Sequence, residues 1–341
     1  MKILIVGSNS IHVSSYVKSL AEKESAIYLL AEEKCDFDQV KEEHLVNFRS
    51  LNPISIVKNY LRLKAILKTL EPEIIHIHQI NRLAYFVSRA ASKLQLPIVS
   101  TAWGSDVLLI PFKNSFFRFL TTKTLQRSNF VTADANVMVE AMQKLDNSVS
   151  KYQLLQYGIE LVDEQEKLNI VYSNRLHKSL YRIDQIILYF KVFIENHIDW
   201  KLVIAGSGDQ TDRLRELVTE NQLSDKVEFV GWLNASENKE WYSKSKIYIS
   251  IPESDGTSVS VLEAMSAGCI PVLSDLPVSH EWIVNNINGI IETTEENPLE
   301  KALELNFQEA KISNKQLVKE KASRKACTVQ FIELYKKSIG K

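Results

Sequence analysis

The sequence contains little cysteine and no long apolar run. Its three cysteines, Cys35, Cys269 and Cys327, lie far apart and show no CxxC spacing, which argues against a disulfide framework and a zinc site. The longest stretch without a charged residue, residues 3–17, is interrupted by polar residues, so no segment suits a bilayer span. Only residues 3–6 are apolar before the first polar residues, too few for a signal peptide, and we expect a cytoplasmic protein.

Glycine and proline are also scarce, with 10 and 8 residues in a chain of 341. Together with 45% hydrophobic and 24% charged residues, this composition excludes collagen-like and disordered chains and is typical of a folded globular protein. At about 150 residues per domain, the length predicts two domains, each large enough to bury its own core.

Short apolar, β-branched runs alternate with stretches that can form helices, the pattern of βα units around a parallel sheet. One series of runs occupies residues 2–6, 27–31, 74–78, 97–101 and 130–133, and a second occupies 170–173, 202–205, 227–230, 247–250 and 270–273. We therefore predict two doubly wound α/β domains, 1–160 and 161–320, that face a central cleft and bind ligands at the carboxyl ends of their strands. The pattern assigns an amphipathic helix near 314–339 to neither domain; residues 321–341 could pack back on the N-terminal domain.

The segment 252–268 has the strongest chemical signal. It follows an apolar run and predicts a tight loop, then a helix that begins near Ser258 and ends at Gly268. The backbone N–H groups of such a loop suit an anion such as a diphosphate. Glu263 lies among apolar helix residues, where a carboxylate is costly to bury without a partner. The alternative is that Glu263 faces solvent and Asp255 is a turn residue or cap.

This segment resembles the retaining glycosyltransferases of family 4, which share the GT-B fold of two Rossmann-like domains. Asp255 and Glu263 are separated by seven residues, and Ala-Met and a Gly-Cys-Ile-Pro-Val run follow, similar to the hallmark of the family. The resemblance implies that Glu263 binds the ribose of a nucleotide-sugar and that Asp255, where the family usually has Glu, lies beside the donor sugar. With Arg175, these two acids are the catalytic residues it implies.

Further segments are similar to the donor side of the family, notably residues 173–175 and 181–184. Arg175 is expected to contact the diphosphate, because a guanidinium fits phosphate oxygens well. Lys178 or Arg182 could substitute for a lysine that the family has five or six residues later, although a loop cation is more often solvated. The expected donor-binding residues are Arg175, Lys178, Arg182, Gly208, Gly231, Gly256, Thr257, Ser258 and Glu263. The alternative for Gly208 is an ordinary turn glycine.

On the acceptor side, residues 7–12 and 101–106 follow strands and resemble family segments, with Trp103 in place of a histidine. The expected acceptor-side residues are Gly7, Ser8, His12, Trp103 and Asp106. His76 and His78 alternate on one strand, and such a pair is more often structural or substrate-facing than metal-binding. We expect no metal and no cofactor, since the nucleotide-sugar, a UDP-sugar rather than a GDP-sugar, is a substrate.

Positive charge is concentrated in residues 51–130, which hold eleven Lys or Arg and three Asp or Glu in a chain of net charge −1. Basic and aromatic residues interleave over 56–70 and 112–119, a composition that suits an anionic membrane surface. The alternative is a solvated helix face with core aromatics. Nucleic acid is not expected, because no binding module accompanies the charge.

The resemblance therefore implies a retaining enzyme that transfers a sugar from a nucleotide-sugar to a saccharide or lipid-linked acceptor, by default in bacterial cell-surface polysaccharide or glycolipid synthesis. The competing hypothesis is a catalytically silent glycosyltransferase-like subunit that scaffolds or regulates a partner enzyme. Three departures support it: a single glycine at Gly7, Trp103 for histidine, and the displaced lysine. A GT-B epimerase matches less well, and a two-domain ligand-binding protein would usually be exported.

Overall fold

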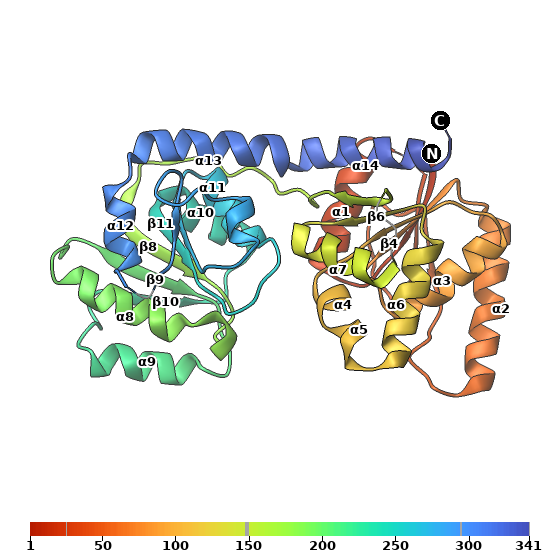
Figure 1. The fold of residues 1–341 in the computed structure, drawn as a ribbon, viewed down its shortest axis with the longest axis horizontal. Coiled ribbons are helices and arrows are strands. Elements are labelled where there is room, and N and C mark those ends of the chain that lie inside the picture. Colours follow the sequence, from red (N-terminus) through yellow and green to blue (C-terminus); the bar gives the residue numbers. More distant parts are fainter. Residues whose placement is uncertain (25, 147–149, 294, 341) are drawn as a thin grey trace. The chain divides into compact units, whose positions relative to one another are not determined.

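The structure is a computed structural model that describes residues 1–24, 26–146, 150–293 and 295–340. The chain forms two compact units (Figure 1). Unit 1 comprises Met1–Gly158 and Arg324–Lys341, and unit 2 comprises Ile159–Ser323. The roles expected of the two domains remain predictions.

Unit 1 is built on a parallel seven-stranded sheet of order β3-β2-β1-β4-β5-β6-β7. Its strands are β1 (Lys2–Val6), β2 (Ala26–Ala31), β3 (Glu42–Leu45), β4 (Ile74–His78), β5 (Ile98–Thr101), β6 (Phe130–Ala133) and β7 (Tyr152–Leu154). The five central strands confirm the predicted apolar runs. The edge strands β3 and β7 lack such a run and were not predicted from the pattern.

Helices cover both faces of this sheet, so successive strand residues enter different cores. Ile3 and Ile5 pack in one cluster, and Leu4 and Val6 pack in another. The helices are α1 (Ile11–Ala21), α2 (Pro53–Leu70), α3 (Arg82–Lys93), α4 (Ser105–Leu108), α5 (Ile110–Lys113), α6 (Ser115–Arg127), α7 (Asn136–Asp146) and α14 (Arg324–Ser338).

Unit 2 repeats this design with a parallel sheet of order β10-β9-β8-β11-β12-β13. Its strands are β8 (Leu168–Asn174), β9 (Lys201–Ala205), β10 (Val227–Gly231), β11 (Ser245–Ser250), β12 (Ile270–Leu273) and β13 (Ile290–Ile291). Its helices are α8 (Ile183–Ile194), α9 (Thr211–Glu220), α10 (Ala235–Lys244), α11 (Val259–Ser266), α12 (Pro298–Glu304) and α13 (Phe307–Lys321), with short 3₁₀ turns η1 (Ser179–Tyr181) and η2 (Ser279–Glu281). The carboxyl ends of β8, β11 and β12 therefore share one edge.

The single C-terminal helix expected near 314–339 is instead two helices, α13 and α14, with a break at Ala322 and Ser323. The carbonyl of Ala322 accepts a hydrogen bond of 2.8 Å from the amide of Ile159, and Ser323 pairs with Ile159 in an isolated bridge. At Gly158 a Cβ would lie 2.6 Å from the Cα of Arg324, so only glycine allows this crossing. The helix is therefore interrupted where the chain passes between the units.

Among the helices of the described ranges, none is both long and apolar enough to cross a bilayer.

Candidate functional site

The side chains expected to bind the donor phosphates meet at the carboxyl ends of β8 and β11. The guanidinium of Arg175 donates a 2.6 Å hydrogen bond to Asp255 Oδ2 and another of 2.6 Å to Ser258 Oγ. Arg175 follows β8, whereas Asp255 and Ser258 belong to the loop between β11 and α11. The parallel pairing of these strands brings together residues about 80 positions apart.

The N-terminus of α11 lies directly beside this guanidinium. Ser258 is the N-cap residue, but its side chain makes no capping bond in the described part of the chain, because its hydroxyl faces Arg175. The N–H groups at the start of this helix and the guanidinium place two sources of positive potential next to each other. An anion such as a diphosphate would be stabilised at this point.

Arg175 is held in a protein environment that keeps it charged. The guanidinium carbon of Arg175 lies over the ring of Tyr181, 4.4 Å from its centroid, in cation–π geometry. Burial alone would lower the pKa of Arg175, but the carboxylate of Asp255, together with Tyr248 and Tyr181, outweighs burial, and the pKa lies above its ordinary value. The side chain is only 10% exposed.

Glu263 lies half-buried on α11, close to three tyrosines that the sequence did not point to. Burial raises the pKa of Tyr248 to about 12, with the negative charges of Asp255 and Glu263 adding to the effect and Arg175 opposing it. The pKa values of Tyr172 and Tyr242 are also raised by burial, and in both Glu263 contributes. The Glu263 charge therefore acts on an aromatic cluster from β8, α10 and β11 whose members are distant in sequence.

The two cations proposed to replace the family lysine lie in different environments. Arg182 donates two hydrogen bonds to Glu292, of 2.9 and 3.0 Å, and Tyr189 donates a third to the same carboxylate. Lys178 is exposed and makes no ion pair with any described residue. Because the guanidinium of Arg182 is occupied, Lys178 is the better candidate for a diphosphate contact.

The predicted glycine Gly208 and its neighbour Gly206 are both sterically required. A Cβ at Gly208 would lie 2.4 Å from the carbonyl oxygen of His177, and one at Gly206 would lie 2.2 Å from that of Arg175. The turn after β9 therefore packs directly on the chain that carries Arg175. Gly231 has a φ of +71° and its carbonyl accepts a 2.7 Å bond from the amide of Gly206. Gly256 donates to Asp255 Oδ1 at 3.0 Å.

A pocket opens beside the Asp255–Ser258 loop, within unit 2. Its enclosed volume is about 30 Å³, and it opens to solvent. The loop residues Asp255, Gly256, Thr257 and Ser258 form one wall, and residues of α11, the end of β12 and η2 form the rest. Of the predicted donor-binding residues, only those of this loop line the pocket, namely Gly256, Thr257 and Ser258.

On the expected acceptor side, the buried carboxylate of Asp106 accepts hydrogen bonds from backbone amides of two loops. Its carboxylate accepts hydrogen bonds from the amide of Ile80 at 2.7 Å and from that of Trp103 at 2.9 Å. Burial raises the pKa of Asp106, and these backbone bonds oppose the rise. The carboxylate thus fixes the loop after β5, and its expected contact with an acceptor hydroxyl remains a prediction.

The other acceptor-side residues lie at the carboxyl end of β1. Gly7 is buried, and a Cβ there would lie 3.0 Å from the side chain of Val13. The exposed ring of His12 meets Trp103 edge-on, with 5.6 Å between ring centroids, and Ser8 is half-buried. Trp103 in turn donates its indole N–H to the hydroxyl of Tyr157. Gly7, Ser8, His12 and Trp103 therefore border one edge of the sheet.

His76 and His78 lie on one face of β4, as predicted, with ring centroids 4.1 Å apart. His76 bonds to Tyr335 of α14 at 2.5 Å and to Thr101 at 2.6 Å. Burial, followed by the charge of nearby His12, lowers the pKa of His78 to about 3. Across the described residues no group of three or more potential ligands is placed to hold a metal ion.

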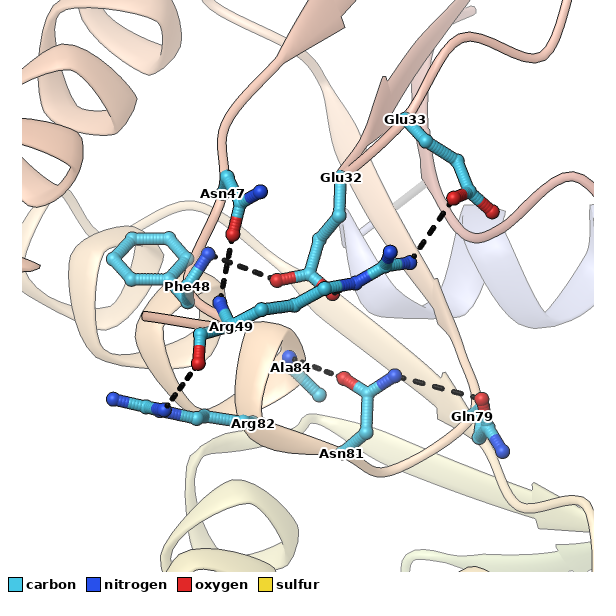
Figure 2. A network of polar contacts seen from close by, with 9 residues as sticks. All are labelled: Glu32, Glu33, Asn47, Phe48, Arg49, Gln79, Asn81, Arg82 and Ala84. Atoms are coloured by element: carbon cyan, nitrogen blue, oxygen red, sulfur yellow. Dashed lines mark hydrogen bonds and ion pairs between the residues drawn. The ribbon is translucent and has the colours of Figure 1, made fainter. Parts of the chain in front are cut away.

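A charged network that the sequence did not single out borders unit 1 (Figure 2). The guanidinium of Arg49 bridges Glu32 and Glu33, which follow β2, at 3.2 Å each. Arg82, at the start of α3, donates to the carbonyl of Arg49 at 3.4 Å and to that of Ser50 at 3.0 Å. Charged residues and backbone carbonyls thus line the carboxyl ends of β2 and β3.

Comparisons with known proteins match both units. The family of glycosyl transferases group 1 matches residues 159–322, and the family described as glycosyl transferase 4-like matches residues 2–135. The chain is 27% identical over 184 residues to the O-antigen chain mannosyltransferase RfbU of Salmonella typhimurium, covering 50% of this chain and 49% of RfbU. It is 28% identical over 123 residues to the UDP-N-acetylglucosamine–peptide N-acetylglucosaminyltransferase GtfA subunit of Streptococcus agalactiae, covering 30% of this chain and 24% of that protein.

The matched regions span about half of RfbU and about a quarter of the GtfA subunit. Among solved structures, HepE of Anabaena in complex with UDP is similar, with a TM-score of 0.80 and 12% identity over 99% of this chain and 100% of HepE. A likeness at this identity shows the fold. The chain therefore belongs to the group 1 glycosyltransferases, of the family 4 type, and has the GT-B fold.

Proposed function

We propose that this chain is a glycosyltransferase that uses a nucleotide-sugar and retains the anomeric configuration of the transferred sugar. The observation that carries the proposal is the position of Arg175, bound to Asp255 and Ser258 beside the N-terminus of α11. Such a site stabilises the charge that develops on a departing diphosphate, and electrostatic stabilisation of this kind is commonly the largest catalytic contribution.

In the proposed reaction the bond between the anomeric carbon and the diphosphate oxygen breaks. A bond forms from the acceptor oxygen to that carbon on the same face, and the acceptor's proton passes to the departing phosphate oxygen. Arg175 and the first-turn amides of α11 stabilise the leaving group, Asp255 orients the sugar, and Glu263 binds the ribose hydroxyls. Because the phosphate accepts the proton, Trp103 can replace a histidine without loss of a required base.

For the donor we propose a UDP-sugar rather than a GDP-sugar. UDP occupies the structurally similar HepE, and the name of the GtfA relative includes UDP-N-acetylglucosamine. For the acceptor we propose a saccharide or lipid-linked saccharide in bacterial cell-surface polysaccharide or glycolipid synthesis, in line with the O-antigen chain that the name of RfbU contains. The charged network that contains Arg49 and Arg82 offers hydrogen-bond donors and acceptors that suit sugar hydroxyls.

We also propose that unit 1 docks on an anionic membrane surface from the cytoplasm. Of the apolar residues in α2, Leu63 and Leu67 belong to the core, but Ile54 is 79% exposed and Leu61 is 60% exposed. The phenylalanines of α5 and α6 are exposed by 36% or more, namely Phe112, Phe116, Phe117 and Phe119. They are not core aromatics, and with the surrounding lysines and arginines they suit a lipid interface.

The silent-subunit hypothesis remains the second candidate, because one cation proposed to replace the family lysine, Arg182, is occupied by Glu292. The name of the GtfA relative also describes a subunit. An assay of sugar transfer distinguishes the two functions.

The test incubates the protein with UDP-sugars and a bacterial lipid extract, and follows label transferred to the extract. We expect transfer, with an α-configured product by NMR from an α-configured donor, and a loss of at least about tenfold in kcat/KM for Glu263→Ala. Glu216→Ala, an exposed acid on α9, is the matched control and should leave the rate unchanged. Turnover unaffected by Glu263→Ala, or an inverted product, contradicts the proposed mechanism.

A further inference from the structure

A groove lies in unit 2 between α13 and the segment that precedes β8. Residues 161–164 form one side, and residues of α13 from Gln308 to Lys319 form the other. The groove has a volume of about 710 Å³ and is open to solvent. Small-molecule sites commonly measure about 300–1,000 Å³, so a ligand of moderate size fits this space. The described lining includes none of the expected donor-binding residues.

The side of the groove opposite α13 is attached to α11 by hydrogen bonds. The amide of Val162 donates to Ser266 Oγ at 3.0 Å, and this hydroxyl donates to the carbonyl of Glu263 at 2.8 Å. Val162 and Ser266 are both buried. The segment 161–164 is therefore a fixed wall, as is usual for a small-molecule site.

Three lysines of α13 line the groove at intervals of four residues, namely Lys311, Lys315 and Lys319. Residues at this interval lie on one face of a helix, about 6 Å apart along its axis. The carboxylate of Glu164 bridges the first two, with one oxygen 2.6 Å from Lys311 Nζ and the other 2.7 Å from Lys315 Nζ. An oxyanion therefore fits between two successive lysines of this row.

The next interval of the row lies between Lys315 and Lys319. Lys319 is exposed, and within the described ranges it forms no ion pair or hydrogen bond. The described lining holds three lysines against two acids, Asp163 and Glu164, so its net charge is +1. One further negative charge beside Lys319 would neutralise the groove.

Apolar side chains lie close to this second interval. Ile312 precedes Lys315 by three residues and Lys319 by seven, so the three share one face of α13. Ile312 is 65% exposed, and Leu161 on the other side of the groove is 43% exposed. A hydrocarbon chain that covers these two side chains removes apolar surface from water. A ligand with both an anionic head group and an apolar chain satisfies both features.

We propose that this groove binds an amphiphile whose head group is a singly charged oxyanion, the carboxylate of a fatty acid or the phosphodiester of a lipid. The head group pairs with Lys319 and Lys315, and the chain lies along Ile312 and Leu161. Asp163, which also lines the groove, disfavours head groups of higher negative charge. The site is independent of the donor site and of the membrane surface proposed for unit 1.

The test measures binding to the full chain by calorimetry, with each amphiphile below its critical micelle concentration. Decanoate and dihexanoyl phosphatidylglycerol supply the two kinds of head group, and the one that binds more tightly identifies the source. Acetate has the charge without the chain, and dihexanoyl phosphatidylcholine has the chains without the net charge. We expect these two controls to bind at least about tenfold more weakly than the anionic amphiphiles.

Variants of the groove separate the contributions of charge and apolar contact. Lys319→Ala and Ile312→Ser should each weaken binding at least about threefold, and since both residues are exposed the Tm should not change. Glu164→Gln removes the carboxylate already held by the row and should strengthen binding about threefold, a gain that damage to the fold would not produce. Lys191→Ala, at an exposed lysine of α8, is the matched control and should bind like wild type.

Binding of neither anionic amphiphile overturns the inference. Acetate or phosphatidylcholine that binds as tightly as the anionic amphiphiles also overturns it, because the groove would then not require head group and chain together. The same conclusion follows if Lys319→Ala and Ile312→Ser leave binding unchanged, or if Glu164→Gln weakens it.

Discussion

At the residue scale, the donor site depends on a guanidinium that already has an anionic partner. Asp255 pairs with Arg175 at 2.6 Å where a diphosphate oxygen is proposed to bind. An incoming phosphate must share or displace this carboxylate, and its negative charge opposes the ligand. The same carboxylate keeps Arg175 oriented. Asp255 therefore favours the orientation of Arg175 but opposes the binding of a phosphate.

Asp255→Asn is therefore expected to strengthen the binding of UDP while reducing sugar transfer. Removing the charge frees Arg175, and a gain of about 1.4 kcal/mol corresponds to roughly tenfold in affinity. Calorimetry with UDP at low and high salt measures the change. Asp225→Asn, which neutralises an exposed acid in the turn before β10, is the control. Weaker UDP binding by Asp255→Asn would show that Arg175 needs its carboxylate to bind phosphate.

The sequence located this site through one continuous segment, 252–268, and through Arg175. It could not reveal that Arg182 is held by Glu292, because the two residues are 110 positions apart and meet only in the folded chain.

At the element scale, the predicted apolar runs became the central strands because strands covered on both faces must be almost wholly apolar. The edge strands β3 and β7 are partly exposed and lack this requirement, and β3 contains two glutamates, whereas β13 is buried but only two residues long. The break between α13 and α14 was not predicted, because it depends on the long-range bond from Ile159 to Ala322.

Tyr335 attaches helix α14 to the rest of unit 1. Its hydroxyl forms hydrogen bonds with His76 on β4 and with Tyr16 on α1. Tyr335→Phe leaves both buried partners short of a hydrogen bond and should lower the free energy of unfolding by about 1–3 kcal/mol. Urea unfolding measures the loss. Tyr60→Phe, which removes a buried hydroxyl that has no partner in the described residues, should be neutral or stabilising. Equal effects of the two changes would contradict this role of Tyr335.

Glu164, in the segment that follows the passage from unit 1 to unit 2, forms ion pairs with two lysines of α13. Its carboxylate oxygens lie 2.6 Å from Lys311 Nζ and 2.7 Å from Lys315 Nζ. Hydrogen bonds from Lys311, then Lys315, lower the pKa of Glu164 from 4.5 to about 2. Since the folded pKa is depressed, the stabilisation is complete above pH 4.5 and is lost as the pH falls toward 2. After solvent screening, Glu164→Gln should cost about 1 kcal/mol at neutral pH.

Urea unfolding at pH 7 and near pH 3 measures this dependence. The difference between wild type and Glu164→Gln should be largest at pH 7 and smaller by more than half near pH 3. Glu216→Gln, in an exposed pair with Arg213, should show little difference at either pH. A gap between wild type and Glu164→Gln that grows on acidification would have the wrong sign for this ion pair.

At the scale of the whole molecule, charge is unevenly divided along a chain of net charge −1. We expect the protein to sediment with anionic vesicles and not with neutral ones, and we expect high salt to release it. Reversing Lys58 and Arg62 to glutamate should weaken binding more than tenfold, since each basic residue contributes about 1 kcal/mol. The same reversal at Lys191 and Lys201 of unit 2 is the control. Equal binding to both kinds of vesicle, or none at low salt, would refute docking through unit 1.

The central claim is that unit 2 holds a nucleotide-sugar at the Arg175 site. The most direct measurement is a thermal-shift screen of the whole chain against UDP, GDP and their sugar conjugates. A ligand at 100 times its Kd adds about 2.7 kcal/mol of stability, so binding should raise the Tm by several degrees. The account predicts a clear rise with the UDP series that Glu263→Ala abolishes. No rise with any of these nucleotides would contradict it and favour the silent-subunit hypothesis.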